Sequence, residues 1–448
     1  MPRHFNVGGP CDQRRHYLVP IHQRLPDVMQ LIDGGAYFVM HAPRQVGKTT
    51  SLLMLGKELT ASGRYAAILL SVQPGSAFRD SVDRAELAIL EQWKYDARFF
   101  LPEPLRPPAW PEAASGGRIG AALSAWTDVC PLPLVVFLDE IDALEGETLR
   151  SVLTQLRAGH PRRPVGFPWS LALVGMRDIR DYKLAAGGSP QLSSHSTSPF
   201  NIISESLTLR NFSREEVEGL YLQHTHDTGQ VFSPGVVDRV FKLTGGQPWL
   251  VNALGRQMVE VLVPQPELPV ELSHVDRAKE LLILRRDTHI DSLAERLREQ
   301  RVRRIIEPML VGEIPGELPD DDRRFILDLG LLTIGPGGAL EVANPIYKEI
   351  IPRLLADAVQ FSIGPLQPTW LNPDGTLNPD RLLEAFLAFW RQHGEALLKA
   401  TPYHEAAPHL VMMAFLHRVV NGGGSIDREY AIGSGRLDLF VRYRDAKL

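Results

Sequence analysis

The chain has 448 residues, of which 44% are hydrophobic and 23% are charged, and its formal net charge is −5. This length suffices for two or three domains with their own cores, and the composition is that of an ordinary folded protein. The net charge excludes a chain that is basic all over, although one face can still be basic. No apolar run is long enough to span a membrane, and residues 1–20 lack the apolar stretch of a signal peptide, so we expect a cytoplasmic protein without a membrane segment. The cysteines Cys11 and Cys130 form no metal or redox motif, in keeping with a reducing compartment.

The first part of the chain alternates apolar strands with helices. Helices are predicted at 51–59 and from Val82 through Leu87 and Leu90 to Trp93, and strands at 37–40, 65–72, 133–142 and 169–178. Strands that are apolar throughout indicate a doubly wound parallel sheet that is covered by helices on both faces. The Pro- and Gly-rich segment 101–117 is expected to be a surface excursion, and the polar segment 187–199 a mobile loop.

From about Ser213 onward the pattern favours helices. The sequence SREE at 213–216 predicts a capping box, Ser233-Pro234 predicts a helix start, and GGQP at 245–248 predicts a break between two helices. Residues 289–306 are predicted to form one arginine-rich amphipathic helix. Residues 327–347 predict a helix end, a hairpin around 335–338 and a return strand, which is the outline of a winged helix. A linker at 362–380 and helices at 381–399 and 404–420 follow.

The stretch HAPRQVGKTT at 41–50 follows an apolar strand and precedes a helix, which is the context of a phosphate-binding loop. Backbone N–H groups of such a loop and the helix N-terminus enclose phosphates, and the Lys48 ammonium would reach the β- and γ-phosphates. Ala42 stands where the usual pattern has glycine, and one methyl group is expected to be tolerated at the entry of the loop. The predicted ATP-binding residues are Ala42, Pro43, Arg44, Gln45, Val46, Gly47, Lys48, Thr49 and Thr50.

The apolar strand PLVVFLDE at 133–140 ends in two acids. We expect Asp139 and Glu140 at the carboxyl end of a strand next to that of the loop, where parallel sheets bind ligands. Asp139 and the Thr49 hydroxyl would then hold Mg²⁺, and Glu140 would orient or deprotonate the attacking water. The sequence therefore predicts a site for ATP and Mg²⁺.

The APRQVGKTT loop, the LDEID strand, GMRD at 175–178 and GGQPWLVNAL at 245–254 resemble the AAA-like ATP-binding proteins of bacteria and archaea, on the AAA+/STAND side of the phosphate-loop ATPases. The resemblance covers roughly residues 1–350. It implies an ATPase core at 1–210, a helical lid at 211–275 and a winged-helix domain at 276–360, followed by a linker at 361–380. A homo-oligomer is compatible with it.

The resemblance also directs attention to Arg177 in GMRDIRD, at the place of the family's sensor residue. An arginine there could contact the γ-phosphate, or act as a finger on a neighbouring subunit. The alternative is that Arg177 and Arg180 pair with the acids Asp178 and Asp181. The two interpretations are evenly balanced.

The arginine-rich region presents a second choice. Its arginines could lie on DNA phosphates, which would make DNA a partner of the winged helix. Acids at helical spacing favour a solvated, salt-bridged face instead. The arginines are Arg285, Arg286, Arg296, Arg298, Arg301, Arg303 and Arg304, and the acids are Asp287, Asp291, Glu295 and Glu299.

Residues 381–448 resemble the first part of a PD-(D/E)xK nuclease. The resemblance implies that Glu405 is the helical acid and that Glu429 and Asp438 are strand acids at a metal site. Asp445-Ala446-Lys447 matches D-x-K, but it lies seven residues beyond Asp438. If both aspartates belong to one strand, this odd separation points them to opposite faces, and if a turn intervenes, there is scarcely room for the hairpin that would bring the lysine back. We therefore expect a nuclease-like fold that is cut short, catalytically inactive, and left with an unpaired strand edge.

The hypothesis from the sequence is an Mg²⁺-dependent, ATP-hydrolysing molecular switch that controls a nuclease-like effector tail, in DNA processing or defence. The alternative is a regulator or scaffold that binds nucleotide without hydrolysing it and binds DNA through the winged helix. Glu140 favours the first hypothesis.

Overall fold

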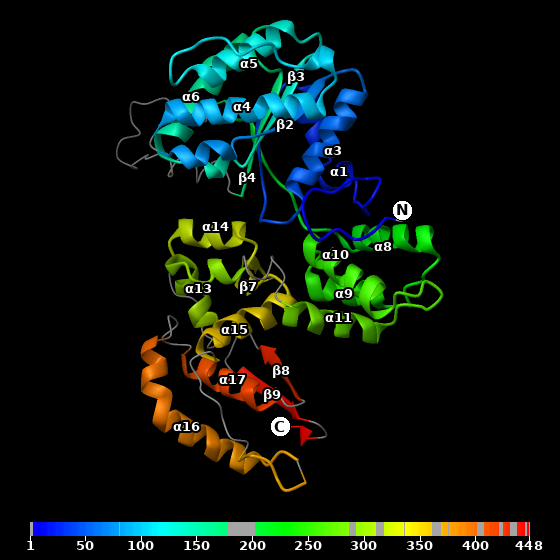
Figure 1. Cartoon of the computed structure of the whole chain (residues 1–448), viewed down its shortest axis with the longest axis vertical. Coiled ribbons are helices and arrows are strands. Elements are labelled where there is room, and N and C mark those ends of the chain that lie inside the picture. Colours follow the sequence, from blue (N-terminus) through cyan, green and yellow to red (C-terminus); the bar gives the residue numbers. More distant parts are fainter. Residues whose placement is uncertain are drawn as a thin grey trace. The chain divides into compact units, whose positions relative to one another are not determined.

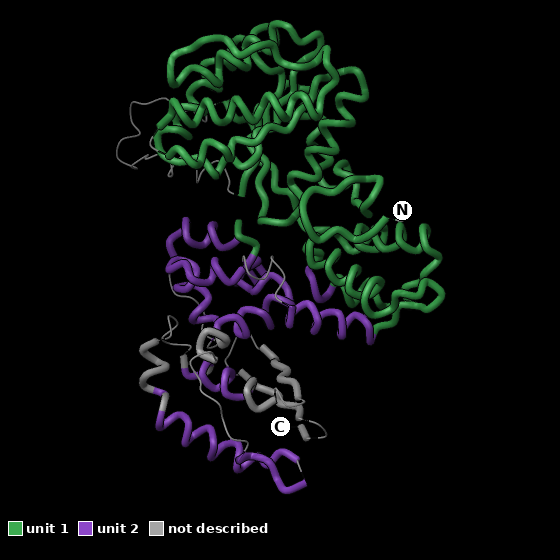
Figure 2. Tube along the Cα trace, viewed as in Figure 1, with its two compact units in different colours: residues 1–241, 246–272, 328–330 green, residues 242–245, 273–327, 331–448 purple. Residues whose placement is uncertain are grey.

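A computed structural model describes residues 3–79, 81–176, 202–285, 293–310, 318–335, 337–360, 369–374, 376–400, 407–420, 424–430, 437–443 and 446–447. The chain divides into two compact units (Figure 2): residues 1–241, 246–272 and 328–330 form the first, and residues 242–245, 273–327 and 331–448 form the second. Among the described ranges, no helix is both long and apolar enough to cross a membrane.

The first unit is built on a parallel sheet of five strands in the order β2-β3-β4-β1-β5 (Figure 1). Strand β5 was missing from the prediction, and β4 lies between β1 and β3, so the expectation that the acidic strand adjoins the strand of the loop is wrong. The register pairs Val39 of β1 with Leu173 of β4, and Val136 of β3 with Ile68 of β2. The strands are β1 (Tyr37–His41), β2 (Ala66–Ser71), β3 (Leu134–Asp139), β4 (Ser170–Gly175) and β5 (Glu205–Thr208).

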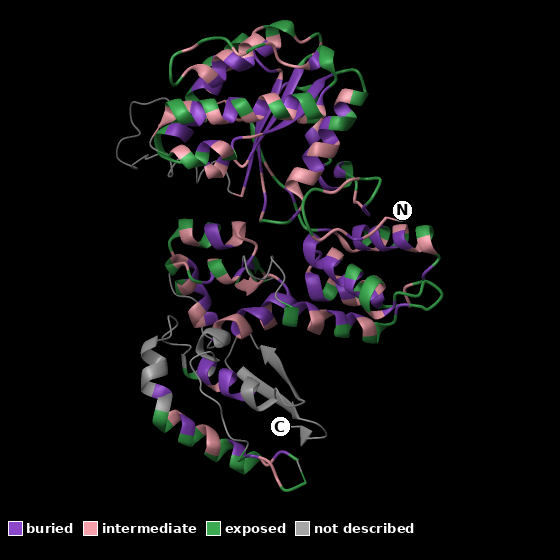
Figure 3. Cartoon of the chain, viewed as in Figure 1, coloured by how far each residue is buried: buried purple, intermediate pink, exposed green. Residues whose placement is uncertain are grey.

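Helices cover both faces of this sheet, as expected for a doubly wound fold. Alternate side chains of β1, β2, β3 and β4 enter different cores, and β3 and β4 are buried along their whole length (Figure 3). One core contains residues of α1 (Ile21–Arg24), α2 (Val28–Asp33) and α3 (Lys48–Ala61). The other contains residues of α4 (Val82–Phe100), α5 (Arg118–Val129) and α6 (Gly146–Gly159).

Segment 101–117 is not merely a surface excursion. Leu101 and Leu105 belong to the core, and the Trp110 indole donates a hydrogen bond to the Leu90 carbonyl at 2.9 Å. Apolar side chains between the prolines therefore anchor the segment. Conversely, Leu87, predicted to lie on the apolar face of α4, is 51% exposed.

The helices of the expected lid are α8 (Arg214–Thr228), α9 (Val236–Thr244) and α10 (Pro248–Arg256), and α10 continues into a π-helical turn, Gln257–Leu262. The capping box is confirmed, because the side chains of Ser213 and Glu216 each accept the other's backbone N–H. Helix α9 begins two residues later than predicted, since Gly235 with φ 86° extends the turn that follows Ser233-Pro234. The break at GGQP is confirmed, with Gln247 as the N-cap of α10.

The second unit begins its helical part with α11 (Leu272–Arg285), and the Lys279 ammonium of α11 lies 2.7 Å from the Glu349 carboxylate of α15. The single long helix predicted for 289–306 is wrong, because a turn at 297–299 separates helical residues 293–296 from α13; residues 286–292 lie outside the described part. The predicted hairpin is present, with β6 paired antiparallel to β7. These elements are α13 (Gln300–Leu310), α14 (Asp320–Asp328), β6 (Leu332–Ile334), β7 (Leu340–Val342) and α15 (Pro345–Gln360).

The last part contains α16 (Pro379–Ala400), α17 (Ala407–Val420) and an antiparallel sheet in the order β10-β9-β8. Its strands are β8 (Gly424–Tyr430), β9 (Leu437–Tyr443) and β10 (Ala446–Lys447). The expected linker is partly packed: Trp370 and Leu377 are each 5% exposed, and the Trp370 ring centroid lies 5.8 Å from that of Phe415. Residues 361–368 and 375 of that segment lie outside the described residues, as does the polar stretch 187–199.

Candidate nucleotide site

The loop between β1 and α3 has the backbone that phosphate binding requires. Gly47, the N-cap of α3, has φ 94°, a conformation that favours glycine, and Gln45 has φ 60°. Ala42 is fully buried, and its backbone N–H continues the sheet by donating to the Gly175 carbonyl at 3.3 Å. The Ala42 methyl group belongs to the core beside α3, which explains why alanine is tolerated there.

Lys48 is folded over this loop. Its ammonium donates to the carbonyls of Ala42 at 2.6 Å and Pro43 at 2.8 Å. Burial lowers the pKa of Lys48 to about 8, and the nearby carboxylates of Asp142 and Asp139 partly offset this effect. The lysine therefore lies within a cluster of acids at the carboxyl edge of the sheet, at the N-terminus of α3.

Thr49 and Asp139 meet at the same edge. The Thr49 hydroxyl donates to the Asp139 carboxylate at 2.8 Å, although β4 lies between their strands. Strand β4 ends at Gly175, which has no side chain. Burial raises the pKa of Asp139, and hydrogen bonds from Thr49 and from the Glu140 N–H act against that rise. A hydroxyl and a carboxylate oxygen are the hard ligands that Mg²⁺ prefers, so this pair fits the ion.

Glu140 follows Asp139 with φ 61°, which is rare for a residue with a side chain and is typical of functional sites. The Ser71 hydroxyl donates to its carboxylate at 3.0 Å, and burial raises the pKa of Glu140. Ser71 lies opposite Asp139 in the β2–β3 register. The sequence analysis missed Ser71, and the available signal was a polar residue at the carboxyl end of an apolar strand.

Arg24 is a second residue that the sequence analysis missed. Its side chain is 4% exposed, and one guanidinium nitrogen would lie 3.4 Å from a Cβ placed on Gly47. The guanidinium lies 4.8 Å from the centroid of the Phe212 ring and donates to the Arg210 carbonyl at 2.6 Å, whereas its Nε has no hydrogen-bond partner among the described residues. Burial lowers the pKa of Arg24 to about 10. The sequence offered no local signal for this role, because Arg24 ends the short, mostly polar helix Ile21–Arg24.

The remaining residues of the loop have different surroundings. Arg44 and Gln45 are exposed and Val46 is buried, whereas the Gln45 carbonyl lies 3.5 Å from the side-chain nitrogen of Gln247 in the GGQP motif. The Thr50 hydroxyl accepts the backbone N–H of Cys11 at 3.1 Å. Arg177, with Asp178, Arg180 and Asp181, lies outside the described residues. Across the described ranges, no cluster of three or more His, Cys, Asp or Glu side chains is placed to hold a metal.

The residues of the nuclease-like tail are brought together only in part. Glu405 and Asp445 lie outside the described residues, whereas Glu429 of β8 is paired with Asp438 of β9. The expectation that there is scarcely room for a hairpin after β9 is wrong, because β10 pairs antiparallel with β9 and sets Lys447 opposite Arg442. Arg442 lies four positions after Asp438, about 13 Å along the strand, so the register still keeps Lys447 away from the acidic pair.

The strand order, the glycine-dependent loop and the Thr49–Asp139 contact define the first unit as having the fold of a Walker-type, phosphate-loop ATPase. Among solved structures, the Walker-type ATPase of Pyrococcus abyssi is 10% identical with a TM-score of 0.52, over 78% of this chain and 99% of that chain. At this identity the likeness shows the fold alone.

Other solved structures have lower scores. Cdc6p from Pyrobaculum aerophilum is 12% identical with a TM-score of 0.40, over 78% of this chain and 95% of that one. The RuvB branch-migration motor of Thermotoga maritima is 14% identical with a TM-score of 0.39, over 74% and 93% of the two chains. No protein-family model and no curated protein matches the chain.

Proposed function

We propose that this chain is an Mg²⁺-dependent ATPase that works as a molecular switch. The observation that carries the proposal is the contact of Thr49 with Asp139 at 2.8 Å, at the edge of the sheet where Lys48 and Glu140 also lie. A lysine, a hydroxyl–carboxylate pair and a further carboxylate at the N-terminus of one helix supply the parts that phosphoryl transfer to water needs.

Each residue has a separate task in this proposal. The N–H groups of the loop and the Lys48 ammonium bind the β- and γ-phosphates. Thr49 and Asp139 would hold Mg²⁺, which neutralises charge on the phosphate oxygens when it is bound. Glu140 accepts a proton from the attacking water while the bond between the γ-phosphorus and its bridging oxygen breaks, and ADP leaves with that oxygen. Burial raises the pKa of Glu140, which makes its carboxylate a stronger base.

The switch would pass its state through the lid to the winged-helix region and the nuclease-like tail, and a role in DNA processing or defence belongs to the same proposal. The alternative, a regulator that binds DNA through the winged helix, is less well supported. Helix α14, which precedes the hairpin, has Asp320, Asp321 and Asp322 in its first turn. A recognition helix usually meets DNA with its N-terminal residues, and these carboxylates would repel phosphates. Asp322 also lies 3.2 Å from Arg301 and 3.6 Å from Arg304, which favours the salt-bridged interpretation of these arginines.

Magnesium removal provides the test of this function. The full chain should release phosphate from ATP in the presence of Mg²⁺, and EDTA should abolish the release because the charge on the phosphates is then not neutralised. Asp139→Asn should lower the rate about 100-fold or more, whereas Asp128→Asn, at an exposed acid of α5, should leave it unchanged. Phosphate release that persists in EDTA, or that Asp139→Asn does not slow, would contradict the assignment.

The tail yields a negative prediction. We expect the full chain not to cut linear or supercoiled DNA with Mg²⁺ or Mn²⁺, with or without ATP. The reason is the register, which pairs Glu429 with Asp438 but places Lys447 opposite Arg442, too far away to help activate water at the acids. Agarose-gel assays of both DNA forms measure this. Metal-dependent cleavage that Lys447→Ala removes would show that the tail contains a complete nuclease site.

A further inference from the structure

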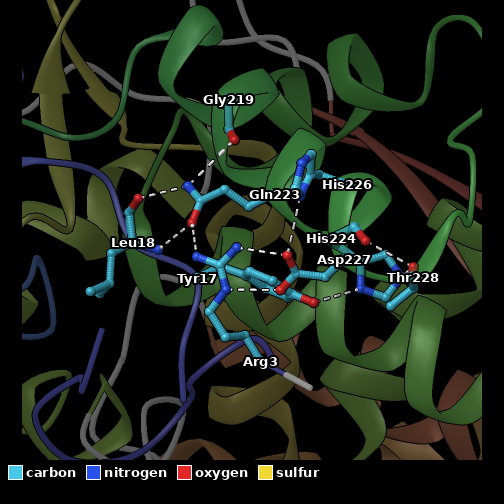
Figure 4. Close-up of polar contacts among 9 residues, drawn as sticks. All are labelled: Arg3, Tyr17, Leu18, Gly219, Gln223, His224, His226, Asp227 and Thr228. Atoms are coloured by element: carbon cyan, nitrogen blue, oxygen red, sulfur yellow. Dashed lines mark hydrogen bonds and ion pairs between the residues drawn. The ribbon is translucent and has the colours of Figure 1, made fainter. Parts of the chain in front are cut away.

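The N-terminal segment 3–24, here called the strap, lies along the lid helix α8 (Figure 4). The Arg3 guanidinium donates to both carboxylate oxygens of Asp227 at 2.8 Å. The Gln223 side chain accepts the Leu18 N–H at 3.2 Å and donates to the Leu18 carbonyl at 2.8 Å. These contacts involve the C-terminal half of α8.

The strap also reaches the N-terminal end of α8. Arg210 binds both carboxylate oxygens of Glu216, at 2.6 and 2.8 Å, and donates to the Gln23 carbonyl at 3.0 Å. Glu216 is the capping-box residue of α8, so the group that fixes the start of this helix is connected to the strap. Glu216, Gln223 and Asp227 are separated by seven and four positions, which places them along one side of the helix.

The same strap touches the phosphate loop. The Cys11 N–H donates to the Thr50 hydroxyl at 3.1 Å, and Arg24 at the end of the strap lies against Gly47. A buried ring anchors the strap between these points: Phe5 is 0% exposed and packs against Tyr17 and Tyr221. One short segment is therefore connected both to the lid and to the helix that carries Lys48 and Thr49.

The contacts of the His224 ring with Gln230 and Tyr17 indicate which ring nitrogen of His224 bears the proton. The Gln230 amide nitrogen lies within 3.2 Å of three backbone carbonyls, which its two N–H groups share, so its oxygen faces His224 Nε2 at 2.9 Å and accepts a hydrogen bond from the Nε2–H. His224 Nδ1 is then bare and accepts the Tyr17 hydroxyl at 3.1 Å. The docked strap in this arrangement contains neutral His224, and a proton on Nδ1 would make the Tyr17 hydroxyl turn its hydrogen away from the ring.

We propose that the strap is a positioning element of the nucleotide site, which transmits the position of lid helix α8 to Thr50 and the phosphate loop. This proposal concerns the regulation of the nucleotide site, so it rests on the proposed ATP binding. The lid and the loop then bind ATP as one coupled unit: nucleotide that orders the loop also fixes α8 through the strap, and loosening of the strap weakens nucleotide binding. Reciprocity of this kind follows from any coupling between two sites.

The test severs the strap from α8 at a distance from the nucleotide. In the full chain, the double variant Arg3→Gln, Tyr17→Phe removes the hydrogen bonds to Asp227 and His224 but keeps the buried Phe5. We expect its affinity for a fluorescent ATP analogue with Mg²⁺ to fall about tenfold, the scale of ordinary coupling between sites. Hydrogen exchange should show that ATP still protects the amides of α3 but no longer those of α8.

A matched control lies on the same helix. Arg214 binds Glu218 at 2.6 Å and Asp238 at 2.7 Å, both within the lid, so Arg214→Gln removes an arginine pair without touching the strap. This control should bind ATP like the wild type. If the double variant exposes the strap amides to exchange, yet keeps wild-type ATP affinity and ATP-dependent protection of α8, the coupling does not exist. If the wild-type chain itself binds no ATP, the proposed function fails instead.

The dependence of ATP affinity on pH separates coupling from a merely structural role of the strap. This measurement also tests the proposal if the strap of the double variant stays docked. Burial lowers the pKa of His224, and the charged groups around it are Asp227, which is paired with Arg3, and Glu260. Docking is therefore complete above the ordinary histidine pKa of about 6.5 and weakens as the pH falls below it. We expect the ATP affinity of the wild type to decrease over this window, and that of His224→Gln to decrease less. Parallel profiles would overturn the coupling.

Discussion

Replacement of Lys48 by alanine is expected to remove most of the affinity for ATP. The ammonium is buried at the N-terminus of α3, and no other described lysine lies on the loop between β1 and α3. Removal of one partner from a desolvated charge pair costs about 2–5 kcal/mol, a decrease in affinity of about 30-fold to several thousand-fold. Titration with a fluorescent ATP analogue measures the loss directly.

Lys57→Ala is the matched control for this variant. Lys57 lies on the same helix and is exposed, so its removal changes the net charge of α3 equally without touching the loop. It should bind ATP like the wild type. If Lys48→Ala also binds ATP as tightly as the wild type, then the phosphate site has been assigned to the wrong residues.

The sequence predicted the parts of the site that are local in the chain. The strand–loop–helix unit around Gly47 and the acids that end β3 are short motifs whose geometry follows from the backbone, and the structure brings Thr49 and Asp139 together as expected. The order of the strands in the sheet was harder to predict from the sequence. Strand β5 is short and mostly exposed, so it lacks the continuous apolar run that made the other four strands recognisable.

Ser71, Arg24 and Thr50 show why the rest of the site could not be predicted. Each owes its role to a partner far away in sequence: Ser71 to Glu140, Arg24 to Gly47, and Thr50 to Cys11. No local pattern encodes such pairings, because they arise from the packing of strands and helices that fold next to one another. The strap is the clearest example of such long-range pairing. Its residues have no periodicity of their own, and their role depends on their contacts with α8.

The errors in the second half of the chain have a similar origin. The arginine-rich region has helical periodicity through residues 297–299, where the structure has a turn. The five residues after β9 looked too few for a return strand, yet β10 pairs with β9 although only two residues lie between the strands. Periodicity and chain length thus limit which helices and strands can form, whereas tertiary packing determines which of them are present in the folded protein.

Replacement of Glu140 by glutamine should separate binding from hydrolysis. The amide has nearly the shape of the carboxylate and can still accept the Ser71 hydrogen bond, so ATP affinity should stay near that of the wild type. An amide cannot take the proton of the attacking water, and loss of a general base lowers kcat about 100- to 10,000-fold. Phosphate release under saturating ATP, measured beside the binding titration, gives both quantities for one sample.

This variant also decides between the two proposed functions. A switch that hydrolyses ATP must lose turnover in Glu140→Gln, whereas Glu147→Gln, an exposed glutamate in the first turn of α6, should turn over ATP at the wild-type rate. If the wild type binds ATP but releases no phosphate above background, the chain is the nucleotide-binding regulator of the alternative hypothesis. If Glu140→Gln turns over as fast as the wild type, the base is a different residue, and the Ser71–Glu140 contact serves only to hold the ends of β2 and β3 together.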